Sequence, residues 1–112
     1  MVKQAYGALY LNGDDSAFTG ALDIQGGWVR LNATGLGASA NPVTVRSGAY
    51  LDLYGGFLEK RPVTICGFGY NYSGALRNNH ATLDSAVSGP VTLAGVAGIF
   101  VSSAARKLTL DG

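Results

Sequence analysis

Seven carboxylates, one histidine and one cysteine are the side chains of this 112-residue chain best suited to catalysis. The carboxylates are Asp14, Asp15, Asp23, Asp52, Glu59, Asp84 and Asp111. Hydrolysis of a glycosidic bond needs two carboxylates that flank it, and a calcium-dependent lyase needs a cluster around its ion. Asp14 and Asp15 follow a turn signal, where solvation explains them, and Asp23 and Asp52 are expected on different faces. The spacing therefore predicts no catalytic pair and no metal site.

The single histidine and the single cysteine do not supply another kind of chemistry. His80 follows two asparagines in a predicted loop, and no Ser-His-Asp or metal-binding arrangement can be built around it. Cys66 has no second cysteine to form a disulfide or a zinc cluster with. The G-x-G of residues 67–69 is not followed by a helix that could bind a phosphate. We expect a protein without catalytic residues or cofactor, and therefore not an enzyme.

Aromatic side chains are a better indication of a functional surface. Tyr10, Tyr54 and Phe100 fall at positions that alternate with apolar residues, so their side chains are expected to point outward. Exposed aromatic rings can stack on sugar rings or bury against another protein. They can also cover the corners of their own fold. These three residues form the candidate interaction surface, and the alternatives remain open.

Composition limits the remaining function classes. Charged residues make up 13% of the chain and the net charge is +1, so neither nucleic acid nor an anionic membrane is an expected partner. No apolar run approaches the roughly 18 residues that span a bilayer, so no membrane insertion is expected. Residues 1–4 do not resemble a secretory signal. The length fits a single domain, residues 1–112.

A three-residue pattern occurs nine times along the chain, in which two apolar residues flank a polar residue or, at residues 99–101, a phenylalanine. It is found at residues 9–11, 22–24, 29–31, 43–45, 51–53, 63–65, 91–93, 99–101 and 108–110. Alternation with a period of two predicts strands that are buried on one face, and the 17 glycines provide corners between them. Between Gly67 and Pro90 the pattern weakens, and residues 74–76 and 81–83 are only poor candidates for strands. Helix content near zero is expected.

The spacing of the pattern predicts the architecture. Leu9, Val29 and Leu51 are separated by 20 and 22 residues, and a second series from Leu22 through Val43 repeats at about the same interval. A chain that returns to the same place every 20–22 residues lays like strands on like strands. We therefore predict an all-β parallel β-solenoid of about five coils. A sandwich of short antiparallel strands is the alternative.

The same register predicts which side chains stack. Arg30 and Asp52 lie on successive coils about 4.8 Å apart, so they are expected to form an exposed ion pair. Such a pair contributes about 0–1 kcal/mol and adjusts register. The inward leucines, valines and isoleucines stabilise the fold instead, by roughly 1.5–3 kcal/mol for each buried side chain.

Several motifs in a fixed order resemble a known family. They lie at residues 18–27, 36–37, 43–53, 73–78, 88–93 and 107–112, and include Thr-Gly-x-Leu, Val-Thr-Val-x-Ser-Gly, Gly-Ala-Leu-Arg-Asn and Ser-Gly-Pro-Val-Thr-Leu. In this order they resemble the autotransporter-associated β-strand repeats, which occur in large exported bacterial surface proteins of the passenger and adhesin type. Cys66 departs from this pattern, because it occupies a corner where sister motifs carry a polar residue.

The resemblance implies a right-handed parallel β-helix displayed at the bacterial cell surface or outside the cell. The handedness agrees with the rule for parallel crossovers. In that setting the chain would be a structural stalk or an adhesive surface. The alternative is a β-helix that binds carbohydrate or cleaves polysaccharide, with surface glycans as its partner.

The two ends of a solenoid predict a further contact. The end coils expose unpaired backbone groups and a slice of core unless something covers them. The first and last strand patterns contribute Leu9, Leu11, Leu108 and Leu110. We expect these residues to form an end-to-end interface between copies of the chain, which would build a filament.

Overall fold

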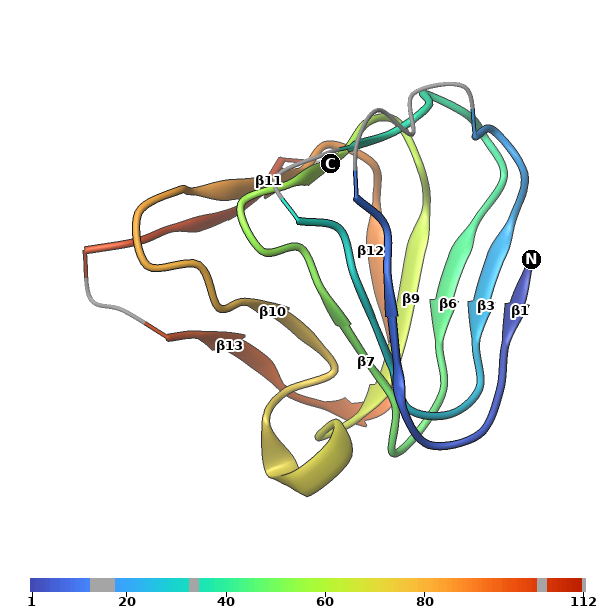
Figure 1. The fold of residues 1–112 in the computed structure, drawn as a ribbon. Coiled ribbons are helices and arrows are strands. Elements are labelled where there is room, and N and C mark those ends of the chain that lie inside the picture. The colour runs from blue at the N-terminus through green and yellow to red at the C-terminus, as the bar shows by residue number, and fades with distance from the viewer. Residues whose placement is uncertain (13–17, 33–34, 103–104, 112) are drawn as a thin grey trace.

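Three parallel sheets wind around one core in the computed structural model, which describes residues 1–12, 18–32, 35–102 and 105–111 (Figure 1). Sheet A contains, in spatial order, β1 (Val2–Lys3), β3 (Leu22–Ile24), β6 (Val43–Val45), β9 (Val63–Gly67) and β12 (Val91–Ala97). Sheet B contains β2 (Ala8–Tyr10), β4 (Trp28–Arg30), β7 (Tyr50–Asp52), β10 (Leu76–Asn78) and β13 (Ile99–Val101). Sheet C contains β5 (Gly35–Leu36), β8 (Phe57–Leu58), β11 (Ser85–Val87) and β14 (Leu108–Leu110).

This arrangement is a parallel β-solenoid of about five turns, as predicted. The described part of the first turn provides β1 and β2, and each later turn adds one strand to each sheet: the third provides β6, β7 and β8, and the fifth β12, β13 and β14. Leu9 pairs with Val29 and Val29 with Leu51, in parallel. Leu22 pairs with Val43, also in parallel. Both predicted ladders are therefore confirmed, and the antiparallel sandwich is wrong.

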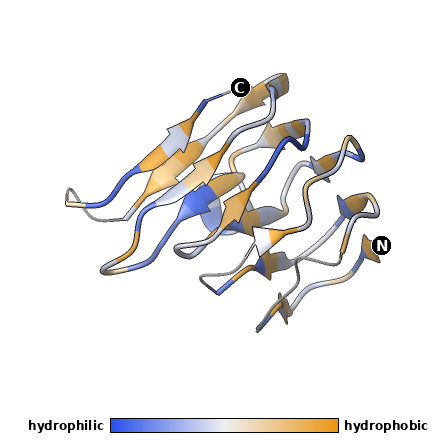
Figure 2. Cartoon of the chain, turned by 90° about the horizontal axis from the view of Figure 1, so that it is seen from above, coloured by the Kyte–Doolittle hydropathy of each residue, from blue (hydrophilic) through white to orange (hydrophobic). Residues whose placement is uncertain are grey.

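The core follows from these registers, because like side chains lie over one another turn after turn. Val29, Leu51 and Leu76 form one inward column of sheet B, and all three are fully buried. Leu36, Leu58 and Val87 form the corresponding column of sheet C. Figure 2 shows the apolar residues recurring on the strands of successive turns. Each buried side chain of this size stabilises the fold by roughly 1.5–3 kcal/mol.

The fourth turn is longer than the first three. Leu51 and Leu76 are register partners 25 residues apart, because the chain makes an extra excursion after β9. That excursion contains a short 3₁₀ turn, Tyr70–Tyr72, and bulges from the solenoid. It is the one helical element among the described residues, and none of the described helices could span a membrane. The poor strand candidate at residues 81–83 is wrong, since the strand of this turn is β11.

One corner of the solenoid is fastened by Arg61, which is fully buried on the third turn. Its guanidinium donates to the backbone oxygens of Phe18 (2.6 Å) and Gly20 (2.7 Å) in the first turn. It also donates to the oxygens of Gly37 (3.0 Å) and Asn41 (3.1 Å) in the second. Burial lowers the pKa of Arg61 because it disfavours the charged form. Four carbonyl acceptors replace the water that this ion has lost.

The side chain of Asn78 joins backbone groups of the later turns, as that of Arg61 does for the earlier ones. The side chain is fully buried on β10, and its Nδ2 donates to the oxygens of Leu83 (3.0 Å) and Lys107 (3.0 Å). Its Oδ1 accepts from the backbone N–H of Gly55 (3.1 Å) and of His80 (3.2 Å). Both donors and the acceptor oxygen are thus satisfied, as a buried amide requires. Asn78 joins the third, fourth and fifth turns.

Candidate functional site

The acidic residues do not form a catalytic cluster in the part of the chain that the structure describes, and no group of three metal-binding side chains occurs there. Asp23 projects from sheet A and accepts two hydrogen bonds from Arg46, at 3.0 and 3.1 Å. These bonds lower the pKa of Asp23. Asp52 belongs to sheet B, so the predicted separation of Asp23 and Asp52 is confirmed. Asp14 and Asp15 lie outside the described residues.

Asp52 forms the predicted ion pair with Arg30, at 3.3 Å between Oδ2 and Nη2, but it is not exposed. The Oδ2 atom also lies 3.6 Å from Nε of Arg77. Its Oδ1 accepts from the backbone N–H of Tyr54 (3.0 Å) and Asn79 (3.1 Å). The prediction of a solvated pair was wrong because neighbouring side chains bury the carboxylate completely. Asp52 is a structural anion between two arginines.

Aromatic rings cover both arginines. The Arg30 guanidinium lies 4.1 Å from the ring centre of Tyr54 and 5.4 Å from that of Tyr10. The Arg77 guanidinium lies 4.9 Å from the ring centre of Tyr50 and 5.3 Å from that of Phe100. Cation–π contacts of this kind contribute about 0.5–2 kcal/mol each.

The predicted interaction residues are thus brought onto one face, where they partly cover their own turns. Tyr10, Tyr54 and Phe100 all lie on the outward side of sheet B against the two arginines. Tyr10 and Phe100 are partly exposed. Tyr54 occupies the left-handed backbone region at a corner (φ 47°), so its ring is held in place by backbone geometry as well as by contacts.

Register places Tyr10 and Phe100 at opposite ends of one outward column. Tyr10 pairs with Arg30, Arg30 with Asp52, Asp52 with Arg77, and Arg77 with Phe100. The two rings belong to β2 and β13, the outermost strands of sheet B. Each ring has an arginine on its inner side.

The residues predicted to form the end-to-end interface lie in or beside different sheets of the solenoid. Leu9 is on β2 of sheet B and Leu11 directly follows it, whereas Leu108 and Leu110 are on β14 of sheet C. All four lie at end turns, and Leu110 is exposed. The inward column of sheet B begins at Leu9 on β2 and ends, four register steps later, at Ile99 on β13. An end-to-end contact that keeps the register would thus set Leu9 against Ile99.

A lysine interrupts the apolar core at the first turn. Lys3 pairs with Ile24, and the column continues through Val45 and Ile65 to β12. The Lys3 side chain folds over this end and donates from Nζ to the oxygens of Gln4 (2.8 Å) and Ala5 (3.0 Å). Inward-pointing charges at an edge strand are a known means of discouraging edge-to-edge pairing.

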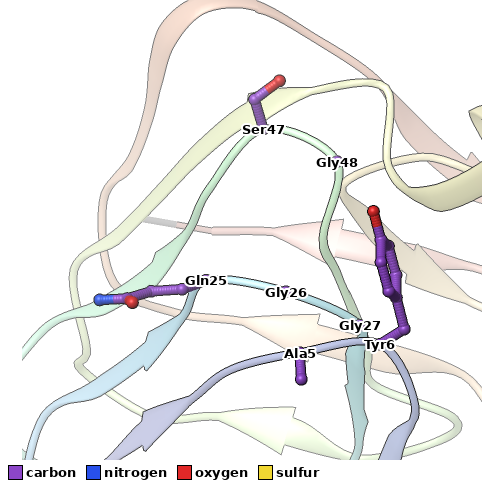
Figure 3. Close-up of a pocket in the computed structure, with 7 residues that line it drawn as sticks. All are labelled: Ala5, Tyr6, Gln25, Gly26, Gly27, Ser47 and Gly48. Atoms are coloured by element: carbon purple, nitrogen blue, oxygen red, sulfur yellow. The ribbon is translucent and has the colours of Figure 1, made fainter.

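A hollow of about 250 Å³ opens at the corner between sheets A and B, and the sequence analysis did not predict it (Figure 3). Its lining residues are Ala5, Tyr6, Gln25, Gly26, Gly27, Ser47 and Gly48. Gly27 has a positive φ of 62°, and a Cβ at this position would overlap the backbone oxygen of Gly7. The glycine pair at residues 26–27 was the available signal, but it predicted only a corner.

A group of aromatic rings stands beside this hollow. Tyr6 forms one wall and is 85% exposed. Its ring centre lies 6.0 Å from that of Tyr70, which lies 5.7 Å from that of Trp28. Trp28 is in turn stacked on Tyr50 at 5.3 Å, with nearly parallel planes. The excursion of the fourth turn therefore folds back to contact the first and second turns.

Comparison of the chain with models of protein families, with curated proteins and with solved structures gives no match. The arguments for function therefore come from the residues and their geometry.

Proposed function

We propose that the chain is a structural, non-enzymatic segment of an exported bacterial surface protein, and that its solenoid associates end to end into a filament or stalk. The motif order that resembles autotransporter-associated β-strand repeats supports the surface location. The solenoid fold supports a scaffold, because its turns stack in a regular register and each turn contacts its neighbours. Labelling of intact cells with an antibody to this segment tests the location, and cells that label only after lysis would contradict it.

The observation that carries the association is the match between the two ends. In a stack that continues the internal register, β13 of one copy pairs with β2 of the next. Ile99 then meets Leu9, apolar on apolar, and Phe100 meets Tyr10, ring on ring. Neighbouring strands lie about 4.8 Å apart, the same order as the ring separation of the Trp28–Tyr50 stack inside the solenoid.

A second copy of the chain is the occupant that fits both ends of sheet B at once, whereas in sheet A the same stack sets Lys3 against Leu93 and limits the affinity. The contact joins two different surfaces, so it does not close on itself and it propagates along the axis. It pairs backbone groups at the outer edges of β2 and β13, which have no neighbouring strand among the described residues. It also covers the exposed side chains of β13.

Light scattering over a concentration series, followed by negative-stain microscopy, tests this contact. We expect the mass to rise with concentration and rods of one width to appear. Ile99→Lys should stop the growth, because it introduces a charge into the interface. Phe57→Lys is the matched control, since Phe57 is 50% exposed, Ile99 is 45% exposed, and β8 is not an end strand. A folded wild-type chain that stays monomeric at every concentration would refute the proposal.

A further inference from the structure

Two tyrosine rings meet at the side of the solenoid, although Tyr6 belongs to the corner between β1 and β2 and Tyr70 to the excursion of the fourth turn. Their ring centres lie 6.0 Å apart, with an angle of 57° between the ring planes. We propose that this pair is a modification site, at which one-electron oxidation joins the two phenols into a dityrosine. The product is a covalent link between the first and fourth turns, and it is separate from the end-to-end contact.

The reaction needs an external oxidant that takes one hydrogen atom from each phenol. A haem peroxidase with hydrogen peroxide is an oxidant of this class, because the peroxide is reduced to two molecules of water while two tyrosyl radicals form. The radicals combine at the carbon atoms ortho to their oxygens, which makes one C–C bond. Each ortho hydrogen then leaves its carbon as a proton and each phenol oxygen takes up a proton, so both phenols are restored. The protein loses two hydrogen atoms in total.

An external oxidant can reach both rings of the pair. Tyr6 is 85% exposed and Tyr70 is 38% exposed, whereas Tyr50, which lies near them, is only 7% exposed. Figure 3 shows the Tyr6 ring projecting from the corner of its turn. Tyr6 and Tyr70 can therefore lose their hydrogen atoms at the surface, and Tyr50 is shielded.

Proximity distinguishes this pair from the other exposed tyrosines. In the part of the chain that the structure describes, Tyr6 and Tyr70 are the one pair of tyrosine rings in contact. Tyr72 is the most exposed tyrosine, at 87%, but its ring contacts Phe68, which has no phenol to oxidise. Two groups held side by side react as though each were present at a very high concentration. Coupling within one chain should therefore be faster than coupling between chains.

The two rings differ in how firmly the fold holds them. The backbone oxygen of Tyr70 accepts from the Oγ of Ser73 (2.6 Å) and from its N–H (3.3 Å), which fixes the turn. The Tyr70 ring also lies 5.7 Å from that of Trp28. Bond formation requires the two tyrosine rings to approach more closely than 6.0 Å, and the exposed Tyr6 is the ring with space to move.

The link should stabilise the fold, because it joins two turns that are far apart in the sequence. A cross-link that closes a long loop restricts the unfolded chain, and the effect grows with the length of the loop. For the loop between Tyr6 and Tyr70, the relation used for disulfides and an m-value of about 2 kcal/mol/M give a rise of about 2 M in the urea midpoint.

The test is oxidation of the intact chain by a haem peroxidase and hydrogen peroxide, at a concentration where light scattering shows a monomer. The expected product is a monomer that is lighter by two hydrogen atoms and has the fluorescence of dityrosine. Tryptic digestion should yield residues 4–30 joined to residues 61–77, and fragmentation should place the bond between Tyr6 and Tyr70. Its urea midpoint should exceed that of the untreated chain by about 2 M.

Variants locate the reaction. Tyr6→Phe and Tyr70→Phe each keep an aromatic ring and should each abolish the intramolecular product. Tyr72→Phe and Tyr10→Phe are the matched controls, because both residues are exposed and neither contacts another tyrosine ring among the described residues, so the yield should be unchanged. Absence of a cross-linked monomer, a bond that maps to other tyrosines, or a full yield in Tyr70→Phe would each overturn the proposal. These results are read on the monomer, so they do not depend on the association experiment.

Discussion

Replacement of Arg61 by methionine tests how the corner of the solenoid is stabilised. The guanidinium is fully buried and forms no ion pair with a carboxylate in the part of the chain described here. It donates four hydrogen bonds to backbone oxygens of two earlier turns. Methionine keeps most of the apolar stem and removes every donor, so the substitution isolates the polar contribution.

The magnitude follows from two opposing effects. Removing a donor from a buried acceptor costs about 1–3 kcal/mol, so four acceptors at the lower limit give a loss of about 4 kcal/mol. Burial of an ion without a counter-ion costs several kcal/mol where nothing replaces its hydration, and in that case methionine would recover the cost. Since four carbonyls already replace the lost hydration of Arg61, we expect the hydrogen bonds to dominate. A loss of about 4 kcal/mol is a large part of the 5–15 kcal/mol that stabilises a typical domain.

Urea unfolding of the monomeric chain, followed by far-ultraviolet circular dichroism, measures this loss. With an m-value of about 2 kcal/mol/M, Arg61→Met should lower the urea midpoint by about 2 M without changing m. Arg61→Lys should lose about half as much, because one ammonium cannot reach carbonyls on both turns as the planar guanidinium does. Arg46→Met is the control, since Arg46 is exposed and solvent screens its ion pair with Asp23, so the urea midpoint should fall only slightly. If Arg61→Met is as stable as wild type, desolvation outweighs the hydrogen bonds and this reasoning is refuted.

Three further predictions follow from other buried or edge side chains. Lys3→Ile should lower the concentration at which chains associate by about tenfold, because it removes a charge from an apolar column at the end; light scattering that shows no change would contradict this. Asp52→Asn should cost about 3 kcal/mol in urea unfolding, because two arginines keep their charge beside a neutral group; an unchanged midpoint would show that the carboxylate is not needed. Burial raises the pKa of Tyr50 above the ordinary phenol value, so its contribution to stability is complete below about pH 10 and is lost as pH rises further. Tyr50→Phe should remove that part of the alkaline decline in the urea midpoint, and an identical decline in both proteins would exclude this cause.

The sequence predicted sheets A and B, apart from β1 and β10, because their strands carry an alternation that recurs every 20–22 residues over the first three turns. Leu22, Val43 and Val63 are typical: each begins an apolar–polar–apolar triplet, and each became a register partner of the next. Sheet C was not predicted as a sheet. Gly35–Leu36 and Phe57–Leu58 are two-residue strands, too short for a period to be recognised.

The burial of the charged side chains of Asp52 and Arg61 was also not predicted from the sequence. Asp52 occupies an outward position, so alternation predicted an exposed side chain. The covering rings come from a corner and from neighbouring turns, as the contacts of Tyr54 and Tyr50 with the flanking arginines show. Arg61 lies between Lys60 and a proline, a context typical of a solvated corner, yet it turns into the core. The hollow at Tyr6 also depends on residues from three turns, which no local pattern brings together.

The third turn is held from both directions, which has a consequence for how the chain melts. Repeat arrays often fray from one end, because each unit depends only on its nearest neighbours. Here Arg61 links the third turn to the two before it, and Asn78 of the fourth turn is bonded to the third turn on one side and to the fifth on the other. Loss of the first turn therefore breaks bonds to a turn beyond its neighbour, and loss of the fifth turn breaks a bond to the Asn78 side chain, which also holds the third turn. The solenoid should melt in a single all-or-none transition, with equal calorimetric and van't Hoff enthalpies, in place of stepwise fraying.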